Sequence, residues 1–128
     1  LMQLPERSYY KDKALVKEYT QLIAEYFRIV RPKLSEKESL AKAERVVALE
    51  TEFAEAYPLP EIQRQRWAER RQQTQDVFIK TYPSLQANTL LQLVPDKTVV
   101  FNPMPESFDF IQKKYKPENL ELLKDYAL

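Results

Sequence analysis

Three glutamates close together in the sequence, Glu50, Glu52 and Glu55, are of a type and spacing that could support acid–base chemistry. Two carboxylates can act as general acid and general base when their surroundings separate their pKa values. Glu52 and Glu55 are three residues apart, which places them on one face of a helix. No histidine accompanies them, and their neighbours Phe53 and Ala54 belong to a predicted core stripe. We therefore interpret the three glutamates as structural and expect Glu50 to pair with an arginine.

Residues 64–71 (RQRWAERR) hold the densest group of basic side chains and the only tryptophan, Trp67. Such a group could bind phosphate while the indole stacks on a nucleic-acid base. The alternative is a solvated helix face on which Trp67 anchors one end to the core. The chain has 20 Lys and Arg against 19 Asp and Glu, a net charge of +1. Because nucleic-acid-binding proteins usually have a strong basic excess, we favour the structural interpretation and expect no nucleic-acid partner.

The composition excludes most common catalytic sites, because the 128 residues contain no glycine, cysteine or histidine. A Gly-rich phosphate loop and a dinucleotide-binding fingerprint both need glycines where the backbone approaches phosphate. Zinc–thiolate sites and Ser–His or Cys–His nucleophiles need the two other missing residue types. We therefore expect no catalytic, cofactor-binding or metal-binding residue in this chain. The absence of cysteine fits a reducing compartment or a bacterial protein.

The size and hydropathy of the chain suit one domain or part of a larger one. Its mass is 15.2 kDa and its mean hydropathy is −0.57. No apolar run approaches the roughly 18 residues of a membrane span, so we expect none in this chain.

Prolines separate segments of helical periodicity, so the predicted fold is mostly α. The first helix should span residues 12–30. Ser35 and Glu38 form a predicted capping box at the start of a second helix that runs to about Tyr57. Pro60 suits the first turn of a third helix, which we expect to break near residues 72–76. Shorter segments begin at Pro83, Pro105 and Pro117.

Apolar spacing predicts which faces of the two long helices are buried. In the first helix the expected core stripe consists of Leu15, Tyr19, Leu22, Tyr26 and Ile29, and it is widened by Val16, Ile23, Phe27 and Val30. In the second helix the expected stripe consists of Val46, Leu49, Phe53 and Tyr57, with a row of mostly smaller residues at Leu40, Ala43, Val47 and Ala54.

Residues 98–101 (TVVF) are the only stretch whose composition predicts a β-strand. An isolated strand is not stable by itself. Because the sequence offers no evident second strand, we expect the partner to come from outside residues 1–128 or from a stretch too short to recognise.

Tyr9 and Tyr10 lie before the first apolar stripe and have no explanation in composition. They end the run LPERSYY at residues 4–10, which resembles the LPxRxYY signature of the neprilysin and endothelin-converting-enzyme family of zinc metallopeptidases. Residues 47–54 (VALETEFA) are similar to the family's vLxLExxLA helix segment. Residues 98–103, followed by Phe108 and Ile111, resemble its vvVxxPeYfxxl passage, and residues 122–126 (LLKDY) resemble its lKdYL segment. The four matches occur in the family's order and span nearly the whole chain.

The chain also departs from the family's pattern. Ala87 stands where the family usually has tryptophan, and residues 72–76 lack the expected Tyr-Asn turn. The family's HExxH helix provides two histidine ligands to zinc and the general-base glutamate, and this chain has no histidine. The catalytic residues of the family are therefore absent from residues 1–128.

The resemblance implies that residues 1–128 are part of the N-terminal, mostly α-helical, lid-type domain of a neprilysin-like peptidase. In the family that domain faces the zinc domain across a closed cavity and limits substrates to peptides and small proteins. It implies the C-terminal catalytic domain of the same protein as partner, peptides as substrates of the parent, and zinc in the parent only. We expect the chain alone to be inactive and a fragment of a bacterial protein, in the cytoplasm, the periplasm or secreted.

A second hypothesis comes from a different class. The chain could be a free-standing helical module that binds a partner protein through an apolar groove. The two hypotheses differ in whether the reading frame continues to an HExxH motif downstream.

Overall fold

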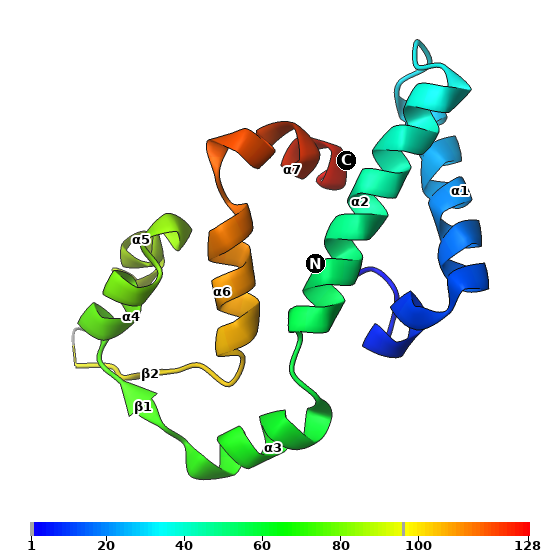
Figure 1. Cartoon of the computed structure of the whole chain (residues 1–128). Helices are drawn as coiled ribbons and strands as arrows, with labels where there is room; N and C mark the ends of the chain where they lie inside the picture. The colour runs from blue at the N-terminus through cyan, green and yellow to red at the C-terminus, as the bar shows by residue number, and fades with distance from the viewer. Residues whose placement is uncertain (1, 96) are drawn as a thin grey trace. The chain divides into compact units, whose positions relative to one another are not determined.

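The computed structural model of the protein describes residues 2–95 and 97–128 (Figure 1). The described residues are mostly α-helical with one small two-stranded sheet, which confirms the predicted fold class. They form two compact units. Unit 1 consists of residues 2–55 and 120–128, and unit 2 of residues 56–119.

Unit 1 contains the 3₁₀ helix η1 (Arg7–Lys11) and the helices α1 (Lys13–Val30), α2 (Glu36–Ala56) and α7 (Leu120–Tyr126). Figure 1 shows α1 and α2 side by side, in blue and in cyan to green. Their shared core consists of Ala24, Phe27, Ala43 and Val46, against which Ile23, Leu34, Leu122 and Tyr126 pack. The last helix in the sequence therefore completes the core of the first two.

Local hydrogen bonds set the starts of both long helices. The Asp12 carboxylate accepts from the amides of Ala14 and Leu15, which caps α1. At α2 the predicted capping box is confirmed: the Glu38 amide donates to Ser35 Oγ at 3.2 Å, and the Ser35 amide donates to Glu38 Oε2 at 2.9 Å. Both caps satisfy amides that have no partner inside the helix.

The buried face of α1 matches the predicted stripe only in part. Phe27 is buried and Ile23 packs against the core as predicted. Leu22, Tyr26 and Ile29 are instead 63%, 49% and 76% exposed, and the buried Ala24 was not predicted. Apolar residues cover about half of this helix, so periodicity alone does not fix its orientation. In α2 the predictions hold for Val46, Leu49, Phe53, Ala43, Val47 and Ala54, which are all buried. Leu40 is instead exposed, and Tyr57 is half-buried.

Unit 2 consists of α3 (Pro60–Glu69), β1 (Gln72–Gln73), α4 (Gln75–Thr81), η2 (Pro83–Leu85), α5 (Ala87–Leu91), β2 (Val100–Phe101), α6 (Pro105–Lys114) and η3 (Pro117–Asn119). Pro60 begins α3 as predicted, and the predicted break falls at β1. The core is aromatic. Ring centroids of Phe78, Tyr82 and Phe108 lie 5.0 to 5.7 Å apart, in tilted and edge-to-face arrangements that aromatic pairs favour.

Of the two predicted sources of a partner for the strand at residues 98–101, the one outside the chain is wrong, and the short unrecognised stretch within the chain is confirmed. Residues 100 and 101 form β2, which pairs antiparallel with β1, Gln72 opposite Phe101 and Gln73 opposite Val100. Two adjacent glutamines have no strand-like composition, so β1 gave no signal in the sequence. The chain closes its own short sheet.

Candidate functional site

The most enclosed titratable group in unit 1 is the carboxylate of Glu50, which is 1% exposed on α2. Its Oε2 accepts from the hydroxyls of Tyr10 at 2.6 Å and Tyr19 at 3.1 Å, and from the Gln3 amide at 3.4 Å. The Tyr10 hydroxyl in turn accepts from the amides of Gln3 and Leu4, both at 3.1 Å. Our expectation of an arginine partner is corrected, because neutral donors hold this carboxylate in place.

The surroundings of Glu50 keep the neighbouring phenols protonated. Burial, reinforced by the hydrogen bond to Glu50, raises the pKa of Tyr10 to about 12. Burial, reinforced by the negative charge of Glu50, also raises the pKa of Tyr19. The pKa of Tyr126 is raised for the same two reasons. At neutral pH Tyr10 and Tyr19 are therefore protonated and donate hydrogen bonds to the buried carboxyl group of Glu50.

A second buried carboxylate belongs to Asp125 of α7, which is 4% exposed. Its Oδ1 lies 2.8 Å from Arg31 Nη1 at the end of α1, and its Oδ2 lies 2.6 Å from Lys42 Nζ in α2. One carboxylate thus ties three helices together. The sequence analysis missed this group, because no local pattern links residues 94 and 83 positions apart.

These clusters bring together three of the sequence motifs. Tyr10 ends LPERSYY, Glu50 lies in VALETEFA, and Asp125 and Tyr126 end LLKDY. Tyr10 donates a hydrogen bond to Glu50, and the negative charge of Glu50 helps to raise the pKa of Tyr126. Tyr9 is 41% exposed, so only the second tyrosine of its motif faces the interior. In unit 1 these motif residues hold helices to one another.

The remaining candidate carboxylates do not join Glu50. Glu52 and Glu55 are exposed, because on the helix they point about 200° and 140° away from Glu50, two and five residues along the chain. A small hollow that is lined partly by Tyr10, Thr51 and Glu55 measures only about 20 Å³. That volume is about what one water molecule needs. The three glutamates therefore do not form an acid–base pair around a substrate-sized cavity.

The arginine-rich segment also differs from its predicted role. Trp67 is 56% exposed and touches the Phe101 ring edge-on, with centroids 4.7 Å apart. It therefore lies against the surface of the small sheet and is not anchored in the core. Arg66 bonds both carboxylate oxygens of Glu106 and also donates to the Pro103 carbonyl at 3.1 Å. The Glu106 hydrogen bond raises the pKa of Arg66, and the pKa of Glu106 is lowered in return.

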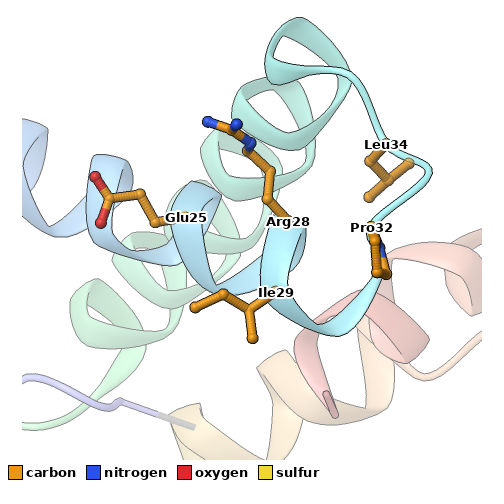
Figure 2. A pocket seen from close by; sticks show the side chains of 5 residues that line it. All are labelled: Glu25, Arg28, Ile29, Pro32 and Leu34. Atoms are coloured by element: carbon orange, nitrogen blue, oxygen red, sulfur yellow. The ribbon is translucent and has the colours of Figure 1, made fainter.

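A hollow of about 420 Å³ lies at the end of α1 and is lined by Glu25, Arg28, Ile29, Pro32 and Leu34 (Figure 2). In Figure 2 Glu25 and Ile29 point to one side of α1, away from Pro32 and Leu34. A second hollow, of about 300 Å³, shares Glu25 and Arg28. Ligand sites combine an enclosed apolar wall with a few polar groups aimed at one point. These open hollows lack such convergence.

Comparison with known proteins identifies the family. The family model described as peptidase family M13, which represents the N-terminal part, matches residues 1–128. The chain belongs to peptidase family M13. This confirms the resemblance to the neprilysin family. No curated protein and no solved structure matched the chain.

M13 peptidases are zinc enzymes, so the residues of this chain are possible zinc ligands only if their chemistry suits the metal. Zinc sites in proteins use mainly histidine and cysteine, completed by carboxylates. The chain has neither histidine nor cysteine. Within residues 2–95 and 97–128, no three acidic side chains gather into a group that could hold a metal ion. The residues of this part of an M13 protein do not fit a zinc site. Across the same residues, no helix is both long and apolar enough to cross a bilayer.

Proposed function

We propose that this chain is the non-catalytic helical part of a zinc metallopeptidase, and that it shapes and restricts access to the active-site cavity of the parent enzyme. The parent would hydrolyse peptides with zinc held by its C-terminal catalytic domain, which would be the partner of this chain. One observation carries the proposal: the M13 model matches the whole chain, from residue 1 to residue 128.

The chemistry of the buried groups supports a structural contribution. The carboxylates of Glu50 and Asp125 accept hydrogen bonds from side chains of their own unit. Buried polar networks that are fully satisfied make a structure rigid and specific. A rigid helical part would exclude bulky substrates from the active-site cavity, because a flexible one would move aside and admit them.

The first experiment concerns the isolated chain. After treatment with a chelator and re-addition of zinc, it should neither retain stoichiometric metal nor cleave a fluorogenic peptide. Retained zinc, or peptidase activity that survives repurification, would place chemistry on this chain and overturn the proposal. A parent reading frame without a downstream HExxH motif would instead support the free-standing interaction module.

The second experiment tests access in the active parent enzyme. Tyr10→Phe removes one donor to Glu50 and should loosen unit 1. We expect the ratio of long-substrate to short-peptide cleavage to rise several-fold, with short-peptide cleavage nearly unchanged. The matched control is Tyr9→Phe, at the exposed tyrosine beside it, which should leave the ratio unchanged. A Tyr10→Phe enzyme that is measurably less stable yet has an unaltered ratio would contradict the access role.

A further inference from the structure

Helix α3 has the least burial of the longer helices described here. None of its ten residues is buried, and Ile62 and Trp67 are 38% and 56% exposed. Leu59, which precedes it, is 42% exposed. A helix that buries no face of its own is held by few contacts, here chiefly the Arg66–Glu106 pair and the Trp67–Phe101 contact. Its surface therefore remains available to another molecule.

The charges on α3 are unequally satisfied. Arg66 is engaged by Glu106, and Arg71 lies 2.9 Å from Glu69. Arg64 and Arg70 are exposed, and no ion pair between described residues includes either of them. Arg64 precedes Trp67 by three residues and so neighbours it on the helix surface. Arg70 follows Trp67 by three residues, at the left-handed position (φ 45°) that ends the helix.

The orientation of Trp67 is fixed in advance. Its ring packs against Phe101 of β2 with the ring centroids 4.7 Å apart, and β2 is itself paired with β1 just after the helix. An exposed indole that already packs against another ring loses little side-chain entropy on binding. Tryptophan and arginine are the residue types most enriched where proteins bind each other tightly.

We infer that the α3 surface, defined by Arg64, Trp67 and Arg70, binds an acidic segment of another polypeptide that presents an apolar side chain between carboxylates. Each free guanidinium offers the fork of donors that matches a carboxylate, and the indole of Trp67, which lies between them on the helix surface, offers apolar area. The inference does not depend on the proposed peptidase role.

A protein segment fits this surface better than a nucleic acid does. Nucleic-acid affinity comes from neutralising many phosphates in succession. This chain has a net charge of +1, and two of the four arginines of the segment are already paired with glutamates. Two free cations beside one indole suit two carboxylates and one apolar side chain.

The test uses Trp67 as its own reporter, because it is the only tryptophan in the chain. Intrinsic fluorescence is followed while the chain is titrated with a terminally blocked peptide that has a central phenylalanine flanked by glutamates. We expect a saturable change in Trp67 emission, weakened at least about tenfold at high salt because exposed charge pairs are screened. The same peptide with glutamine in place of glutamate should cause no saturable change.

Variants locate the binding. Arg64→Gln with Arg70→Asn, which keeps a residue that tolerates the left-handed conformation, should weaken binding at least about tenfold. The control Arg28→Gln removes an exposed arginine of α1 and should leave binding unchanged. Circular dichroism and the retained Trp67 signal verify that the double variant is folded. Fluorescence anisotropy of a labelled peptide then tests Trp67→Phe, expected to weaken binding several-fold.

Five results would overturn the inference. These are an emission that stays constant up to millimolar peptide, equal binding of the glutamine peptide, and an equal loss in Arg28→Gln. The fourth is tighter binding of a single-stranded oligothymidylate, which would assign the surface to nucleic acid. Sedimentation velocity would reveal self-association through α3, which would make a second copy the occupant and likewise replace the acidic partner.

Discussion

Units 1 and 2 bury different chemistry. Unit 1 encloses two carboxylates, Glu50 among tyrosine hydroxyls and Asp125 between two cations. Unit 2 encloses aromatic rings and leaves its Arg66–Glu106 pair partly in solvent, with side chains 27% and 47% exposed. A buried polar group is specific about its partners, whereas an aromatic cluster is specific mainly about volume. Unit 1 should therefore depend on particular atoms, and unit 2 on filled space.

The largest expected effect tests the filled space of unit 2. Phe78→Ala should lower the free energy of unfolding by about 3–5 kcal/mol, because it removes a ring that contacts both Tyr82 and Phe108. Urea unfolding gives the magnitude, and hydrogen exchange read by mass spectrometry locates it within residues 56–119. The control Val77→Ala, at an exposed neighbour on α4, should stay within about 0.5 kcal/mol. Equal loss of protection in unit 1 would mean that the two units unfold together.

The next effect tests the particular atoms of unit 1. Glu50→Leu should cost about 3 kcal/mol, because it strands the hydroxyls of Tyr10 and Tyr19 without their acceptor. Glu50→Gln keeps one acceptor oxygen and should cost about half as much. Glu55→Gln, at an exposed position on the same helix, serves as the control and should be nearly silent. A Glu50→Leu protein as stable as the unsubstituted chain would show that the stability of unit 1 also depends on filled volume and not on these hydrogen bonds.

Alkaline pH should weaken unit 1 through the same phenols. Because folding raises the pKa of Tyr10 from 10 to about 12, the neutral phenol is favoured in the folded state. Its contribution is fully present below pH 10 and is lost as pH rises from 10 to 12. Two pKa units correspond to about 2–3 kcal/mol. Between pH 9 and 12 the free energy of unfolding, measured by denaturation, should therefore fall less with pH in Tyr10→Phe than in the unsubstituted protein. The exposed Tyr115→Phe should show the same pH dependence as the unsubstituted protein. Identical pH slopes in all three proteins would remove Tyr10 from the explanation.

The smallest effect is expected at the surface pair of unit 2. Glu106→Gln should cost less than about 1 kcal/mol, because the pair is partly exposed and screened by salt. The melting temperature should fall slightly at low salt and hardly at all at high salt. A loss above about 2 kcal/mol would show that unit 2 also depends on a specific charge pair, and the contrast between the units would disappear.

Local signals in the sequence predicted the helices well. Ser35 with Glu38, and Pro60, fixed two helix starts because capping and proline geometry act within one turn. The buried face of α1 could be derived only in part, since half of the helix is apolar and α2 decides which part is covered. The strand β1 was invisible, because the pairing of Gln72 with Phe101 is imposed by tertiary structure.

The candidate site was predicted less completely. The sequence analysis singled out Glu50 and Tyr10 separately, but their contact joins residues 40 positions apart. Tyr19 was assigned to a core stripe, and its hydroxyl turns out to share the same carboxylate. Trp67 was expected to be anchored in the core, and its exposure follows from the absence of any buried residue on α3. Distant partners of polar groups leave no periodic trace that a single sequence can reveal.

The discontinuity of unit 1 has a consequence for synthesis on the ribosome. Helix α7, which supplies Asp125 and Tyr126, emerges only after residues 56–119 have been translated. At roughly 5–20 residues per second, that interval is on the order of several seconds. During it Arg31 and Lys42 await their shared anion, and Ala24 and Phe27 lack part of their cover. The contiguous unit 2 has no such delay. Unit 2 should therefore finish folding before unit 1 on the ribosome. A chaperone that shields α1 and α2 would act in that interval.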